Sequence, residues 1–122
     1  MNDLARVRFD RDEKILTTTI AGEIDISNAG DLRRSIDAQL ADATTVIIDL
    51  SATTFLDSTG VALLFEMATR LRTTRRTLYL VIPADAPIRR IATLTSLDEE
   101  VTVLPNLSDV TTPHETPEPE PI

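Results

Sequence analysis

Two loops of this chain carry side chains suited to chemistry or to binding a partner. In the first, Asp57, Ser58, Thr59 and Gly60 directly precede an amphipathic stretch. The first turn of a helix has free amides that favour a negative charge, so a phosphate on the Ser58 hydroxyl would be stabilised there. Ser58 is therefore a candidate phosphorylation site. An aspartate or serine before a helix is most often only a cap, so the capping interpretation stays open.

The second loop, residues 22–27, contains Asp25 and Ser27 and also leads into a predicted helix. In open α/β sheets, binding sites gather beyond the carboxyl ends of the strands. We therefore expect this loop to lie beside the Ser58 loop and both to contact a partner.

Leu63 and Met67 are one helical turn apart and lie nearly opposite Val61 and Phe65 on the predicted helix. If Val61 and Phe65 face the sheet, Leu63 and Met67 face solvent close to Ser58. A leucine beside a methionine on a surface suits an adaptable contact patch. The alternative is that the third predicted helix or a loop covers them.

The elements that must position these loops alternate between strands and helices. Runs of β-branched and aliphatic residues predict strands, at residues 7–9, 14–21, 46–50, 78–82 and 101–104. The runs at 46–50 and 78–82 are almost continuously apolar, which is typical of strands covered on both faces. The predicted fold class is α/β, a mostly parallel sheet of four to five strands packed with three to four helices.

Apolar residues at helical spacing predict the helices. The first spans residues 28–41, with Ser27 or Asn28 as its cap, and the second spans 59–72. The third starts near Asp85, a suitable cap, with Pro87 in its first turn. A short turn is expected at 107–110.

Composition narrows the function classes. The formal net charge of −8 over 122 residues disfavours nucleic acid and anionic membranes as partners. Without cysteine there are no disulfides, thiolate metal sites or cysteine nucleophiles. No apolar run is long enough to span a bilayer, and no secretory signal is visible, so we expect a cytoplasmic protein. Residues 3–110 should form one domain, and the acidic, proline-rich residues 111–122 a disordered tail.

Catalysis by Ser58 would need a base to activate its hydroxyl. The single histidine, His114, lies in the predicted tail, and no Gly-x-Ser-x-Gly surrounds Ser58. The chain also has no glycine loop to cradle a nucleotide. We therefore expect a binding protein that uses neither a cofactor nor a metal and is not an enzyme.

Three stretches carry a family resemblance. Gly22-Glu23-Ile24-Asp25, Val46-Ile47-Ile48-Asp49-Leu50-Ser51 and Phe55-Leu56-Asp57-Ser58-Thr59-Gly60-Val61 together resemble the bacterial STAS-domain anti-sigma factor antagonists. The similarity runs from Val7 to about Val110. At Thr95-Ser96-Leu97 the family often has Thr-Gly-Leu, a departure remote from the Ser58 turn.

The resemblance implies a regulator of transcription that works by partner switching. Its unphosphorylated form would bind an anti-sigma factor that is also a serine kinase, which frees a sigma factor. The kinase would phosphorylate Ser58 and the complex would separate, until a PP2C-type phosphatase restores the serine. Asp25 matches an acidic position of the kinase contact, and we expect a monomer or weak dimer. The alternative is a STAS component of a stress-signalling or lipid-transport complex that acts purely by binding proteins.

Overall fold

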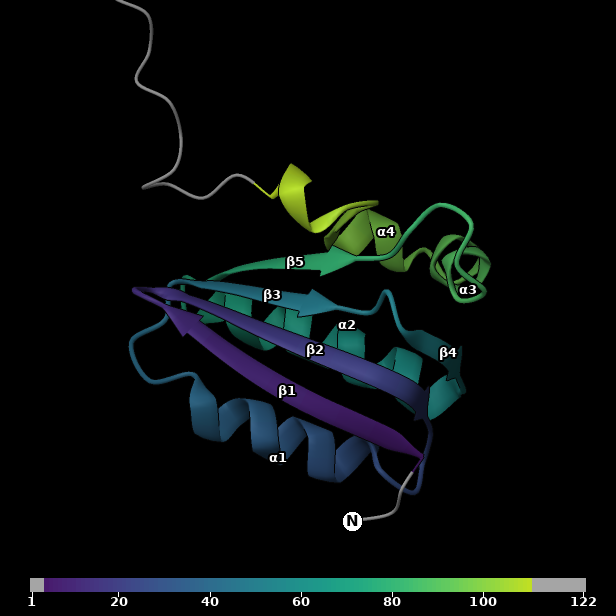
Figure 1. Cartoon of the computed structure of the whole chain (residues 1–122), viewed down its shortest axis with the longest axis horizontal. Helices are drawn as coiled ribbons and strands as arrows, with labels where there is room; N and C mark the ends of the chain where they lie inside the picture. Colours follow the sequence, from purple (N-terminus) through teal and green to yellow (C-terminus); the bar gives the residue numbers. More distant parts are fainter. Residues whose placement is uncertain (1–3, 111–122) are drawn as a thin grey trace, which may run out of the picture.

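The computed structural model describes residues 4–110 (Figure 1). Within that range one sheet contains β1 (Ala5–Asp12), β2 (Ile15–Ile24), β3 (Thr45–Asp49), β4 (Thr53–Leu56), β5 (Thr77–Val81) and β6 (Thr102–Leu104). The helices are α1 (Ala29–Gln39), α2 (Ser58–Thr73), α3 (Arg89–Leu94) and α4 (Leu97–Glu100), followed by the 3-10 turn η1 (Leu107–Asp109). The tail predicted at residues 111–122 lies outside the described residues.

The sheet has the order β1-β2-β3-β5-β6, and β4 pairs separately with β2. Only the β1–β2 pair is antiparallel among the described pairs, which confirms the predicted mostly parallel sheet. The long strand β2 pairs with β3 through residues 15–19 and with β4 through residues 22–24. The chain leaving β3 therefore returns, through β4, to the edge of the sheet where β2 ends. The sequence did not predict β4, because four residues are too short to show a strand pattern.

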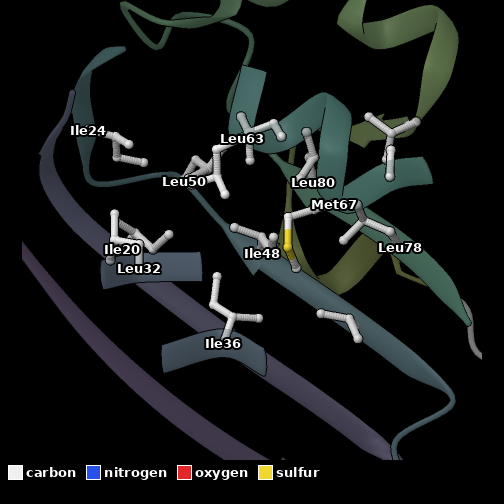
Figure 2. Close-up of a cluster of buried hydrophobic side chains, with 14 of the residues drawn as sticks. Ile20, Ile24, Leu32, Ile36, Ile48, Leu50, Leu63, Met67, Leu78 and Leu80 are labelled. Atoms are coloured by element: carbon white, nitrogen blue, oxygen red, sulfur yellow. The ribbon is translucent and has the colours of Figure 1, made fainter. Parts of the chain in front are cut away.

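The main core lies between the sheet and the helices. Figure 2 shows Met67 of α2 among side chains from α1 and from the central strands, including Ile36, Ile48 and Leu80. On the opposite face, a second cluster contains only Ile15, Ile47 and Val81 as fully buried members, among the described residues. The prediction that the central strands are covered on both faces therefore holds only in part.

The cap of α1 and the start of α3 differ from the prediction. The helix α1 begins at Ala29, and the side chain of Asn28, at its N-cap position, makes no capping hydrogen bond. The helix α3 begins at Arg89 rather than near Asp85, so Asp85 is not its cap. Pro87 disfavours helical backbone at Ala86, which makes a turn back to the carbonyl of residue 83 instead. The predicted last turn is confirmed as η1.

The prediction that Leu63 and Met67 form an exposed patch is wrong. Leu63 is 6% exposed and Met67 is fully buried, whereas Val61 and Phe65 are half-buried. The helix α2 contacts α1 and α4 as well as β5. The fully buried residues of α2 form one helical stripe, in a different phase from the predicted one: Gly60, Leu63, Leu64, Met67, Ala68 and Leu71. Leu63 and Met67 are therefore covered, but Figure 2 shows the central strands and α1 around Met67 rather than the third helix or a loop that the alternative named.

The described part of the chain contains no helix that is both long and apolar enough to cross a membrane.

Candidate functional site

The Asp57 carboxylate connects the two predicted loops. Its Oδ1 accepts the Gly60 N–H at 2.9 Å, which caps α2. Its Oδ2 accepts the N–H of Ile26, in the loop after β2, at 3.1 Å. The Asp57 N–H in turn donates to the Ile24 carbonyl at 3.2 Å. The capping interpretation is therefore confirmed, and the two loops lie together at the carboxyl end of β2 as predicted.

Gly60 allows the first turn of α2 to lie against the end of β2. A Cβ atom at this position would come within 2.9 Å of the Ile24 carbonyl oxygen, a distance that real Cβ atoms essentially never show. The backbone of Gly60 has no positive φ. A close approach between helix and strand, rather than a special backbone conformation, therefore requires glycine here.

Ser58 is the first residue of α2, and its side chain is exposed. The N–H groups of the first helical turn have no acceptor within the helix and attract negative charge. A phosphate on Ser58 would meet that positive end of the helix dipole. The phosphate would also lie beside the Asp57 carboxylate. The helix dipole would therefore attract it, and the carboxylate would repel it. Thr59, the next residue, is half-buried.

Asp25 and Asn28 fix the shape of the loop between β2 and α1. Asp25 Oδ1 accepts two hydrogen bonds from Ser27, one from its main-chain N–H at 2.9 Å and one from its side-chain hydroxyl at 2.5 Å. Asn28 is 1% exposed; its amide donates to the Glu23 carbonyl at 2.8 Å and its Oδ1 accepts the Asp25 N–H at 3.0 Å. Asn28, one of the two predicted caps, therefore binds the main chain of the preceding loop instead of capping α1. It holds the Asp25 carboxylate, which is half-exposed, beside the exposed Ser27.

Two exposed apolar side chains belong to the segments that form this site, and sequence reasoning did not single them out. Ile26 is 79% exposed and its main chain is bonded to Asp57. Phe55 is 44% exposed and stands opposite Glu23 in the pairing of β4 with β2. The sequence does not show that Ile26 is exposed, because a loop lacks the regular spacing of apolar residues that separates buried from exposed positions in a helix or strand. An aromatic residue in a strand ordinarily indicates a core position.

Among residues 4–110 no three histidine, cysteine, aspartate or glutamate side chains are grouped so that they could hold a metal ion. The carboxylates at this end of the sheet are instead engaged with main-chain N–H groups, as Asp25 and Asp57 illustrate. The arrangement presents hydrogen-bonded loops and an exposed hydroxyl. It suits recognition by another protein.

The known protein family that matches is the STAS domain, over residues 6–110. No curated protein sequence gives a significant match. Among solved structures, an anti-sigma factor antagonist from Mycobacterium paratuberculosis is 30% identical, with a TM-score of 0.77, covering 86% of this chain and 89% of that one.

Two further solved proteins share the fold at lower identity. A putative anti-sigma factor antagonist from Thermotoga maritima is 17% identical, with a TM-score of 0.77, over 84% of this chain and 89% of that one. The anti-sigma factor antagonist SpoIIAA, in its unphosphorylated form, is 18% identical, with a TM-score of 0.68, over 90% and 91%. SpoIIAA of Bacillus in its phosphorylated form matches with a TM-score of 0.60 at 18% identity, over 90% and 95%.

The family match spans most of the chain, and the 30% identical structure is covered almost completely. The chain therefore belongs to the STAS domain family.

Proposed function

We propose that this protein is an anti-sigma factor antagonist controlled by phosphorylation of Ser58. In the proposed cycle, the unphosphorylated form binds an anti-sigma factor with serine kinase activity and so releases a sigma factor. The observation that supports this most is the exposed Ser58 at the first residue of α2, joined through Asp57 to the loop that carries Asp25. The 30% identical antagonist from Mycobacterium paratuberculosis supports the choice of partner.

The modification itself is a phosphoryl transfer that the bound kinase would catalyse. The Ser58 Oγ forms a bond to the γ-phosphorus of ATP, and the bond from that phosphorus to the β,γ-bridging oxygen breaks. ADP leaves, and the hydroxyl proton passes to a base of the kinase. A PP2C-type phosphatase would restore the serine by hydrolysis: water adds to the phosphorus, the bond to Ser58 Oγ breaks, Oγ takes a proton, and inorganic phosphate leaves. This chain contributes the acceptor and its position, and acts by binding rather than by catalysis.

The charge of the phosphate explains why binding would respond more than folding. Phosphorylation adds roughly −1.5 to −2 charges at Ser58. In the free protein, water and the positive end of the α2 dipole stabilise this charge. In a docked complex the phosphate would be partly desolvated beside Asp57 and close to the loop of Asp25, and uncompensated charge in an interface is costly.

The apolar part of the contact is assigned to Ile26 and Phe55 rather than to Leu63 and Met67. The former pair is exposed, with Ile26 in the loop bonded to Asp57 and Phe55 two residues before Asp57, whereas the latter pair lies in the core. Exposed apolar side chains beside a polar site are typical of protein interaction surfaces. Asp25, Ser27, Asp57, Thr59 and Gly60 would then shape the surface around Ser58.

The test is to mix the purified full chain with each anti-sigma factor kinase encoded in the same genome and with Mg-ATP. Mass spectrometry then maps the phosphorylated residue. We expect one kinase to modify Ser58 and to bind the unmodified chain. Ser58→Ala should bind but accept no phosphate, whereas Ser108→Ala, a change at another exposed serine, should be modified like the wild type. Capture of transport or stress-complex subunits alone, with no kinase bound, would contradict the proposal.

A further inference from the structure

A shallow groove opens between α1 and α2 beside the Ser58 turn. It holds about 230 Å³. Ala29 and Gly30 of α1 line one wall, and Thr59, Ala62 and Leu63 of α2 line the other. The hollow exists because small residues face each other where longer side chains would meet. Thr59 directly follows Ser58, so the groove starts at the proposed phosphorylation site.

The rim of the groove is polar and displaceable. Arg33 Nη1 of α1 lies 3.6 Å from Glu66 Oε1 of α2, and the two side chains are 39% and 48% exposed. An ion pair this exposed contributes little to stability, so a partner can separate it at small cost. The lining below this rim, which includes Leu63 and Ala29, is apolar.

A partner that docks on Ser58 with an interface of standard size can reach this groove. Such interfaces bury about 800 Å² on each protein, roughly a disc of radius 16 Å. Ala62 lies four residues beyond Ser58, only about 6 Å along the axis of α2. The groove is therefore well inside the surface that a protein docked on Ser58 would cover.

The charges along this surface specify the chemistry of the occupant. The end at Ser58 carries the carboxylates of Asp25 and Asp57, and the chain as a whole has a net charge of −8. The middle is apolar, with the Arg33–Glu66 pair at its rim. A complementary partner therefore presents an apolar side chain with a basic residue next to it.

We propose that the groove receives an apolar side chain of the anti-sigma factor, and that a neighbouring basic residue of that protein faces Asp25 and Asp57. This inference rests on the proposed function, because it names the anti-sigma factor as the occupant. The surface that binds the anti-sigma factor would then have two parts. Contacts at the Ser58 end depend on phosphorylation, whereas contacts in the groove do not.

The first test fills the groove. Ala62→Leu places a larger side chain in it, and Ala38→Leu makes the same change at an exposed position of α1 outside the groove. Leucine is a good helix former, so both variants should fold. The probe is the anti-sigma kinase that modifies the wild-type chain at Ser58. We expect Ala62→Leu to bind it about tenfold or more weakly, and Ala38→Leu to bind within about twofold of the wild type.

A second variant separates binding from stability. Gly30 is the second residue of α1; a Cβ there would meet only the flexible Arg34 side chain, at 3.5 Å, and leucine is a better helix former than glycine. Gly30→Leu should therefore raise the melting temperature and yet weaken binding about tenfold. Weaker binding in a more stable protein cannot result from unfolding.

The outcomes distinguish this inference from the proposed function. If no anti-sigma kinase binds the wild type, the proposed function is wrong and the groove proposal falls with it. A second outcome is that the wild type binds the kinase and that Ala62→Leu and Gly30→Leu bind it with the same affinity as the wild type. In that case only the groove proposal is wrong. A wild-type dimer in sedimentation that Ala62→Leu dissociates would also overturn it, because the occupant would then be a second copy of this chain.

Discussion

The Asp57 carboxylate accepts the main-chain N–H of Ile26 at 3.1 Å, across a separation of 31 residues in the chain. Its other oxygen caps α2 through Gly60. One side chain therefore fixes the start of the helix that carries Ser58 and the loop that carries Asp25. The negative charge that opposes a phosphate and the geometry that presents the serine come from the same residue.

Replacing Asp57 by alanine should destabilise the fold by about 1–2 kcal/mol, because the cap of α2 and the bond to Ile26 are both lost. Urea unfolding followed by circular dichroism measures this. Asp85→Ala is the matched control, since Asp85 is exposed and caps no helix, and it should change stability by less than about 0.5 kcal/mol. Equal losses in the two variants would show that Asp57 has no special structural role.

Alanine at Gly60 and at Gly30 should have opposite effects on stability. At Gly60 the added Cβ would come within 2.9 Å of the Ile24 carbonyl oxygen, so the helix must shift and we expect a loss of about 1–3 kcal/mol. At Gly30, the second residue of α1, the added Cβ meets only Arg34, so the higher helix propensity of alanine should stabilise the protein by less than the roughly 1 kcal/mol that this change gives in a helix interior. Denaturant midpoints of both variants provide the check, and a stabilising Gly60→Ala would contradict the close-approach argument.

Met67→Ala should destabilise the protein by about 2–5 kcal/mol, since it leaves a cavity among Ile36, Ile48 and Leu80. Thr69→Ala changes an exposed residue on the same helix and should stay within about 0.5 kcal/mol of the wild type. Thermal and chemical unfolding measure both variants. A small effect of Met67→Ala would restore the surface position that the sequence suggested.

That case shows where sequence reasoning stops. The helical spacing correctly predicts α2 and places Leu64, Ala68 and Leu71 in the core. It cannot show which of two overlapping helical stripes faces the sheet, because both stripes contain these three residues. The stripe that the fold buries contains Leu63 and Met67, whereas Val61 and Phe65 are half-buried.

Other features of the fold also divide into those set by local sequence pattern and those set by contacts between distant segments. The apolar runs of β3 and β5 and the Asp57 cap depend on local pattern and could be predicted. The short strand β4 forms only because β2 extends beyond β3, and α3 starts late because of Pro87. The bond between Asp57 and Ile26 is a tertiary contact that no local pattern indicates.

Ile26→Ala should weaken binding to the anti-sigma kinase about tenfold, equivalent to about 1.4 kcal/mol, without altering the fold. Ile26 is 79% exposed and contributes its main chain, not its side chain, to the bond with Asp57. Leu107→Ala is the control, because Leu107 is also exposed but lines a hollow with Ile15, at the opposite end of β2. Isothermal titration calorimetry compares the three proteins, and equal weakening by both changes would argue against a specific contact at Ile26.

The central claim is that one phosphate on Ser58 turns binding off while the fold persists. The most direct measurement is the affinity of the full chain for the anti-sigma kinase, determined by titration calorimetry with unmodified protein and with protein phosphorylated only at Ser58. We expect phosphorylation to weaken binding at least about tenfold and to change the free energy of unfolding by less than about 1 kcal/mol. Equal affinity of the two forms, with Ser58 fully phosphorylated, would contradict the account.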